Sequence, residues 1–198
     1  LVTICRKGED RSAINPFYFA LLGSIAAATS ARGFNLLVSF QESPENFRAD
    51  FVASGLADAM IVIGTSSNQA AWDYFGEALE SGLDFVCWGS TGAPFRSLRS
   101  DNAAGGRLAA EHLLSLGRRN IALIGPATGE GRQFDERRQG FITALAQAGI
   151  TPIIAEPPSG QDRQDEGTAA AALLLNQHPE IDGIFTVSDM LALGALQK

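Results

Sequence analysis

The chain alternates between short apolar runs and longer stretches in which apolar residues recur with the period of a helix. Four runs in the first half are almost continuously hydrophobic, as is typical of strands covered on both faces of a parallel sheet: residues 1–5, 35–40, 59–64 and 84–89. This alternation predicts βαβ units, in which each crossover helix packs on a face of the sheet. The pattern therefore indicates an α/β fold.

The second half repeats the scheme. Strands are expected at 120–125, 152–155 and 183–187, and helices at 103–116, 134–148 and 165–177. A last helix begins near Asp189 and runs to Lys198 without a glycine stop, so we expect the second lobe to continue beyond the chain. The segment 90–100 interrupts the rhythm with Thr91-Gly92-Ala93-Pro94. We place the lobe boundary there, with lobes at 1–98 and 99–198.

Composition and charge narrow the function classes. The formal net charge is -7, and the only lysines are Lys7 and Lys198, a balance that repels phosphate backbones. No apolar run reaches the roughly 20 residues that span a bilayer, and no signal peptide opens the chain, so we expect a cytoplasmic protein without membrane contact. Cys5 and Cys87 lie in expected strands and are interpreted as reduced core thiols rather than a disulfide.

Searches for catalytic motifs give no positive result. The loop 125–132 follows a strand, but a phosphate-binding P-loop would need Gly and Lys where Glu130 and Gly131 stand. His112 lies within an expected helix and His178 precedes a proline, so neither is placed as a general base. The histidines and cysteines also lack the spacing of a metal site. We therefore expect neither an enzyme nor a bound cofactor or metal.

Polar and aromatic residues do collect after the expected strands, where open parallel sheets bind ligands. Aromatic faces pack on sugar or base rings, and an arginine can donate two hydrogen bonds at once. These positions are 15–17, 65–66, Trp88, 101–102, Arg137 and 188–189. The set is suited to binding a small polar molecule.

Four motifs in order resemble the lactose-repressor (LacI/GalR) family of transcriptional regulators. The longest is residues 101–125, DNAAGGRLAAEHLLSLGRRNIALIG, and the others are Asn15-Pro16-Phe17, Arg137-Arg138-Gln139-Gly140-Phe141 and residues 188–196, SDMLALGAL. The resemblance implies two Rossmann-like lobes, as in type I periplasmic binding proteins, that close on a sugar, sugar derivative or nucleoside. It also implies a homodimer, and operator DNA bound through an N-terminal helix-turn-helix domain that this sequence lacks.

The same resemblance suggests residues that contact the effector. Phe17 would pack on the ligand ring, Arg137 would donate to hydroxyls or a carboxylate, and Asp101 would lie near the hinge. The full expected set is Asn15, Phe17, Trp88, Asp101, Arg137, Asp162, Ser188 and Asp189. Two positions depart from the family: Trp88 stands where many members have an aspartate, and Gln161-Asp162 where relatives often have an aromatic.

Local structural roles remain open for several of these residues. Asn15, Asp101 and Asp189 have the side chains that cap helices, and Phe17 could belong to the core. Two other functions also remain open, an extracytoplasmic sugar-binding protein of a transport system and a doubly wound enzyme. A helix-turn-helix or a signal peptide encoded upstream would separate regulator from transport protein.

Overall fold

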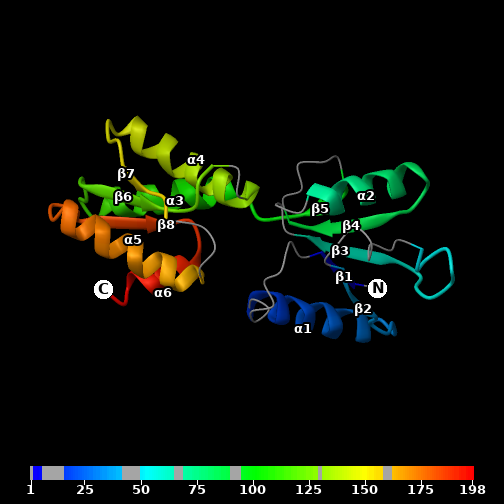
Figure 1. Ribbon diagram of the computed structural model, residues 1–198. Coiled ribbons are helices and arrows are strands. Elements are labelled where there is room, and N and C mark those ends of the chain that lie inside the picture. Colours follow the sequence, from blue (N-terminus) through cyan, green and yellow to red (C-terminus); the bar gives the residue numbers. More distant parts are fainter. Residues whose placement is uncertain are drawn as a thin grey trace. The chain divides into compact units, whose positions relative to one another are not determined.

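The computed structural model describes residues 2–5, 16–41, 50–64, 69–89, 95–128, 131–157 and 162–198. The chain divides into two compact units, Leu1–Arg99 (unit 1) and Ser100–Lys198 (unit 2). Each unit contains one parallel sheet with helices packed on it (Figure 1). The two units are described separately below.

Unit 1 contains a five-stranded sheet in the order β2-β1-β3-β4-β5, in which every pair of neighbours is parallel. Helices α1 and α2 lie on opposite faces of this sheet (Figure 1). The elements of unit 1 are β1 (Val2–Cys5), α1 (Pro16–Ser30), β2 (Val38–Gln41), β3 (Met60–Gly64), α2 (Gln69–Glu80), β4 (Phe85–Trp88) and β5 (Ser97–Leu98).

Alternate residues of β3 contribute to two different apolar clusters. Met60 and Val62 pack with the aromatic rings of Trp72, Phe75, Phe85 and Phe95, whereas Ile61 and Ile63 pack with apolar side chains of α1. Successive strand residues point to opposite faces, so an uninterrupted apolar run is required when both faces are covered. The hydrophobic runs in the sequence thus reflect a sheet buried between two helical layers.

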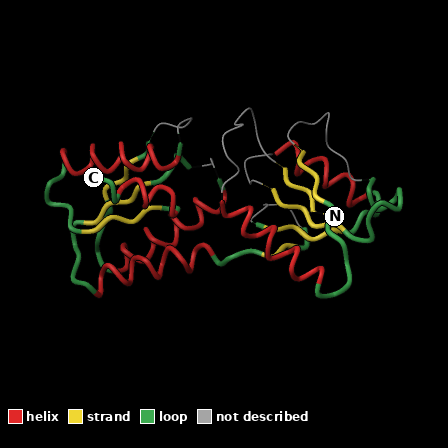
Figure 2. Tube along the Cα trace, turned by 90° about the horizontal axis from the view of Figure 1, so that it is seen from below, coloured by secondary structure: helices red, strands yellow, loops and turns green. Residues whose placement is uncertain are grey.

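Unit 2 contains a three-stranded parallel sheet in the order β7-β6-β8. Helices α3 and α4 cover one face, and α5 and α6 cover the other (Figures 1 and 2). All four residues of β6 are buried. The elements of unit 2 are α3 (Asn102–Ser115), β6 (Ile121–Ile124), α4 (Arg132–Gln147), β7 (Ile153–Ala155), α5 (Arg163–Gln177), β8 (Gly183–Thr186) and α6 (Asp189–Ala195).

The structure confirms the predicted α/β class with parallel sheets and corrects several boundaries. Strand β5 lies inside the segment interpreted as an irregular joint, because Ser97 and Leu98 pair with the end of β4. Strand β2 begins at Val38, which pairs with Val2, rather than at the expected residue 35. Helix α5 begins two residues earlier than expected because Asp162 caps it. Among the described helices, none is long and apolar enough to cross a membrane.

Candidate functional site

Helices α3 and α4 cross at two glycines. A Cβ atom on Gly106 would overlap the backbone carbonyl of Arg137, and one on Gly140 would overlap that of Ala103. The missing side chains let the two backbones come into contact near the start of α3. This close approach brings the first turn of α3 next to Arg137 in α4.

A network of hydrogen bonds forms at this crossing. Arg137 donates from Nε to Oδ1 of Asn102 at 3.0 Å and from Nη1 to the carbonyl oxygen of Val187 at 2.8 Å. Asn102 in turn donates from Nδ2 to Oε2 of Glu136 at 2.9 Å, and Arg132 donates from Nε to the other oxygen of Glu136 at 3.1 Å. We call these four side chains and the Val187 carbonyl the Arg137 network. It connects both helices to the end of β8.

Arg138, the next residue of α4, is buried and bonds the end of β6. Its Nη2 donates to the carbonyl oxygens of Gly125, at 3.3 Å, and Pro126, and its Nη1 donates to Oε1 of Glu156 at 2.8 Å. These carbonyls follow β6 at the carboxyl edge of the sheet. Arg138 therefore satisfies main-chain groups that the ends of strands leave unpaired.

Ser188 directly follows the carbonyl that Arg137 binds. It occupies the N-cap position of α6, but its side chain accepts no capping hydrogen bond. Its Oγ is buried and has no hydrogen-bond partner among the described residues. A buried hydroxyl without a partner carries a free-energy cost of about 1–3 kcal/mol, which a ligand group could remove.

Arg137 remains a cation although it is half-buried. Burial lowers its pKa, and the carboxylates of Asp189 and Glu136 act in the opposite direction. An arginine titrates so far above neutral pH that the guanidinium stays charged. Its Nη2 has no hydrogen-bond partner in the described part of the chain. The arrangement thus places a free cationic donor and a free hydroxyl near the end of β8.

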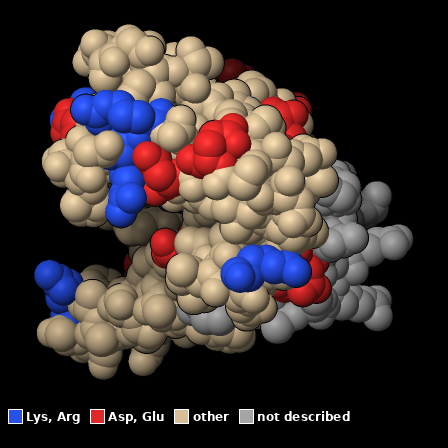
Figure 3. Space-filling view, turned by 90° about the vertical axis from the view of Figure 1, so that its left-hand side faces the viewer, with Lys and Arg blue, Asp and Glu red and all other residues tan. Residues whose placement is uncertain are grey.

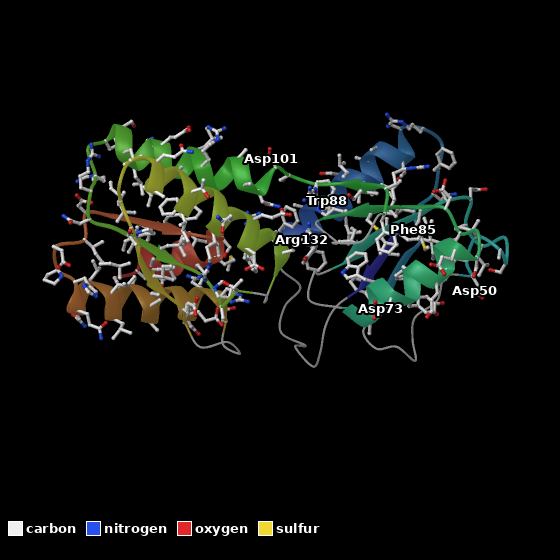
Figure 4. All side chains as sticks on the ribbon, turned by 90° about the horizontal axis from the view of Figure 1, so that it is seen from above. Asp50, Asp73, Phe85, Trp88, Asp101 and Arg132 are labelled. Atoms are coloured by element: carbon white, nitrogen blue, oxygen red, sulfur yellow. The ribbon has the colours of Figure 1, made fainter. Side chains whose placement is uncertain are left out.

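Three of the predicted ligand-contacting residues are aspartates that lie at the starts of helices. Asp101 caps α3, since its Oδ1 accepts from the backbone N–H of Ala104 at 2.9 Å, and Asp162 caps α5 by accepting from Gln164 N–H at 2.8 Å. Asp189 is exposed and is the first residue of α6, after the N-cap Ser188. Figure 4 places Asp101 and Arg132 at the starts of α3 and α4, at one end of unit 2. Ligand contact by these aspartates stays a prediction.

The aromatic candidates belong to unit 1. Phe17 lies in the first turn of α1 and is 53% exposed, so it is not a core residue. Its ring packs edge to face on that of Tyr18, with 5.6 Å between the ring centroids. Trp88 ends β4 (Figure 4) and packs against the apolar cluster beneath α1. Asn15 and the positions 65–66 lie outside the described residues.

A shallow recess of about 310 Å³ adjoins the Arg137 network, but neither Arg137 nor Ser188 lines it. Its lining mixes two arginines with two carboxylates: Thr128, Arg132, Asp135, Glu136, Arg138 and Gln139. The face in Figure 3 likewise shows basic and acidic side chains side by side among larger uncharged areas. In the described part of the chain, no three His, Cys, Asp or Glu residues are grouped to hold a metal ion.

Sequence reasoning did not assign roles to Asn102, Glu136 or Arg138. Asn102 was visible as a polar residue after a strand, but its partners are more than thirty positions away. Glu136 fits the pattern of carboxylates on the solvated face of a helix, and Arg138 was noted only as part of the motif at 137–141. Only the crossing of α3 and α4 reveals that these side chains are bonded to one another or to strand ends.

Among curated proteins, the chain is similar to transcriptional regulators and to transport binding proteins. It is 30% identical to the HTH-type transcriptional regulator CelR of Thermobifida fusca over 201 residues, which covers 98% of this chain and 58% of CelR. It is 25% identical to the transcriptional repressor PurR of Edwardsiella ictaluri, covering 91% and 54%. The ribose import binding protein RbsB of Escherichia coli is 26% identical, covering 92% and 63%. The chain thus spans little more than half of the regulators it matches.

Solved structures give the same result. The CelR–cellobiose complex superposes with a TM-score of 0.78 at 26% identity, covering 99% of this chain and 61% of that one. A LacI-family regulator from Enterococcus faecium with bound ribose superposes with a TM-score of 0.75 at 26% identity, covering 98% and 70%. Residues 11–198 match the family described as periplasmic binding proteins and sugar binding domain of LacI family. The chain therefore belongs to this family of LacI-type sugar-binding domains.

Proposed function

We propose that this chain is the effector-sensing part of a LacI-type transcriptional regulator and that its effector is a saccharide or a closely related polar metabolite. The observation that carries the proposal is the pair of unsatisfied donors near the end of β8, Nη2 of Arg137 and Oγ of Ser188. Sugar hydroxyls both donate and accept hydrogen bonds, so a sugar could satisfy either group. The relatives bound to cellobiose and ribose support the same ligand class.

Phe17 and Trp88 supply the second element of the proposal. An exposed phenyl ring and a half-buried indole at the carboxyl edge of a parallel sheet suit the apolar faces of a sugar ring. The indole of Trp88 also offers one N–H donor, which could donate to a sugar hydroxyl. Substitution of either ring by alanine is expected to weaken sugar binding without altering the contacts of unit 2.

We further propose that the protein binds the sugar without catalysing a reaction on it. Around the Arg137 network both oxygens of Glu136 already accept hydrogen bonds, so this carboxylate is poorly placed to act as a base. His112 lies in the last turn of α3 and His178 caps the end of α5, away from the carboxyl edge of the sheet. A sugar recovered after long incubation is expected to be unchanged by NMR.

The test of the effector site is a binding experiment. A thermal-shift screen with cellobiose, ribose, other sugars, sugar acids and nucleosides should raise the melting temperature for at least one compound, because a ligand at 100 times its Kd adds about 2.7 kcal/mol of stability. Calorimetry should then give a loss of about 2 kcal/mol or more for Arg137→Ala, the value of a charged hydrogen bond. The control is Arg107→Ala, whose side chain is about half exposed and, among the described residues, pairs only with Glu111. Equal affinities of the two variants would refute the site.

A regulator must transmit binding to DNA, and we propose that it does so as a homodimer. Effector binding would favour one of two states of the full-length protein and thereby change its affinity for an operator. The DNA contact itself would come from a helix-turn-helix domain outside this sequence, because the chain carries a net charge of -7. In the alternative, supported by the similarity to RbsB, the same site would serve sugar transport. A helix-turn-helix encoded upstream of this sequence would identify a regulator, and a signal peptide would identify a transport protein.

The proposed contact between two copies involves α1. This helix carries no charged residue over Pro16–Ser30, in a chain whose charged content is 19%. Its outward side exposes Phe19, Ala20, Gly23 and Ala27. Two acidic chains could therefore meet there without repulsion between like charges. We expect Ala27→Glu to shift the mass measured by light scattering from dimer to monomer. Ala169→Glu, on the exposed side of α5, is the matched control and should leave the mass unchanged.

A further inference from the structure

Asn102 is the residue of the Arg137 network that contacts both charged partners. It is the first residue of α3, two positions after Ser100 begins unit 2, and only 6% of its surface is exposed. Its Oδ1 accepts from the guanidinium of Arg137, and its Nδ2 donates to the carboxylate of Glu136. Both polar ends of the amide therefore bond within the protein, and the burial of Asn102 leaves little of its surface for a ligand.

The bond from Asn102 affects how Arg137 can meet a ligand. An arginine side chain has several rotatable bonds, and ordering it on binding costs roughly 0.5–1.5 kcal/mol. Here two hydrogen bonds, from Nε to Asn102 and from Nη1 to the Val187 carbonyl, set both the position and the plane of the guanidinium. The remaining nitrogen, Nη2, then has a defined direction before any ligand arrives.

We infer that Asn102 is a positioning residue for effector binding: it orients the guanidinium of Arg137 through Nε and makes no effector contact of its own. The inference rests on the proposed function in one respect, that Arg137 donates to the effector. It adds that the affinity depends on a residue at the start of unit 2 whose amide bonds the side chains of Arg137 and Glu136. Loss of this contact leaves the charge of Arg137 in place but lets its direction vary.

The chemistry of an amide explains why this position holds asparagine. The side chain stands between a cation and an anion, and an amide can accept from Arg137 while it donates to Glu136. An aspartate would still accept from Arg137 but would place a second carboxylate against Glu136. An alanine would satisfy neither neighbour. The two substitutions therefore separate the contact to Arg137 from the contact to Glu136.

The first test follows the Nε–H group of Arg137 by NMR and needs no ligand. Its ¹H–¹⁵N signal is identified by its disappearance in Arg137→Lys, and we expect slow exchange with water because the proton is bonded to Asn102. Asn102→Ala should shift this signal and accelerate its exchange by about tenfold or more, whereas Asn102→Asp should retain slow exchange. The control Asn176→Ala, on the exposed end of α5, should change nothing. An unchanged signal in Asn102→Ala would overturn the inference.

The second test is a double-mutant cycle on sugar affinity, with cellobiose and ribose as the probes. Asn102→Ala should weaken binding of the sugar by about tenfold in the wild-type background and by less than about twofold in Arg137→Ala, because its effect passes through that side chain. Equal losses in both backgrounds would mean a merely structural role and would also overturn the inference. Circular dichroism and melting temperature confirm that each variant is folded. If neither these two sugars nor any other compound of the thermal-shift screen binds the wild type, the proposed ligand class fails, while the NMR test still decides the role of Asn102.

Discussion

Arg137 and Arg138 are consecutive residues of α4, yet they donate hydrogen bonds to the ends of two neighbouring strands. Arg137 binds the carbonyl oxygen of Val187 after β8, and Arg138 binds the carbonyl oxygens of Gly125 and Pro126 after β6. Successive helical residues point about 100° apart, so one helix can reach both strand ends. The order β7-β6-β8 makes these two parallel strands neighbours at the position where the strand order of the sheet reverses.

The two arginines should differ in what they stabilise. Arg138 is buried and its hydrogen-bond partners Glu156, Gly125 and Pro126 lie inside unit 2, so Arg138→Met is expected to lower the stability of this unit by about 3 kcal/mol. Arg137→Met should cost less stability and more sugar affinity. Both tryptophans, Trp72 and Trp88, belong to unit 1, so circular dichroism is the readout for unit 2. An unfolding curve of Arg138→Met that matches that of Arg107→Met would contradict this assignment.

Ser188 should show opposite effects on stability and binding. Ser188→Ala removes a buried hydroxyl that has no partner in the described part of the chain, and we expect the unliganded protein to become more stable by about 1 kcal/mol. The same change should weaken sugar binding, because the hydroxyl would otherwise bond the ligand. Urea unfolding and calorimetry on the same sample measure the two effects. A variant that loses both stability and affinity would indicate an ordinary structural serine.

The crossing of α3 and α4 should tolerate no side chain at Gly140. Gly140→Ala places a Cβ against the carbonyl of Ala103 and should destabilise unit 2 by about 1–3 kcal/mol. Gly105→Ala is the matched control, since nothing lies within 4 Å of its added Cβ on the exposed side of α3. That control should be neutral or up to about 1 kcal/mol stabilising, because alanine favours helices. Thermal unfolding by circular dichroism compares the two, and equal melting temperatures would disprove the close contact.

Cys87 should be unreactive while unit 1 is folded. Its thiol is fully buried, and burial raises its pKa to about 12. The thiolate is the reactive form, so a disulfide reagent at pH 8 should label Cys87 only after urea is added. The measurement is made in Cys5→Ser so that a single thiol reports. Fast labelling of the folded variant would contradict the burial.

The raised pKa of Cys87 also implies a pH dependence. Below about pH 8.5, the usual value for a cysteine, the thiol is protonated in both the folded and the unfolded chain, so it adds no pH effect. Between that pH and about 12 only the unfolded chain releases the proton, so stability falls as pH rises. Cys87→Ala should show a shallower loss over this range, measured by tryptophan fluorescence of unit 1. Identical slopes in both proteins would exclude the contribution of Cys87.

Much of the fold could be predicted because it depends on local patterns. Continuous apolar runs identified the buried strands, and capping residues such as Asp101 located helix starts to within a few positions. Strand β5 was missed since Ser97 and Leu98 are too short a run to stand out and are strand only through pairing with β4. The motif around Arg137 pointed to a binding arginine, and whether it contacts an effector stays a prediction.

The sequence by itself determined the α/β class, the succession of strands and helices, and the polar residue types that follow the strands. Each of these depends on side chains close together along the chain, through periodicity, propensity and capping. Only the tertiary structure decided that Asn102 bonds both Arg137 and Glu136, that Arg138 bonds the end of β6, and that Ser188 has a buried hydroxyl without a partner among the described residues. Those facts arise where α3, α4 and two strands meet, and hydrogen bonds between residues so far apart in sequence require the packed backbone to bring them together.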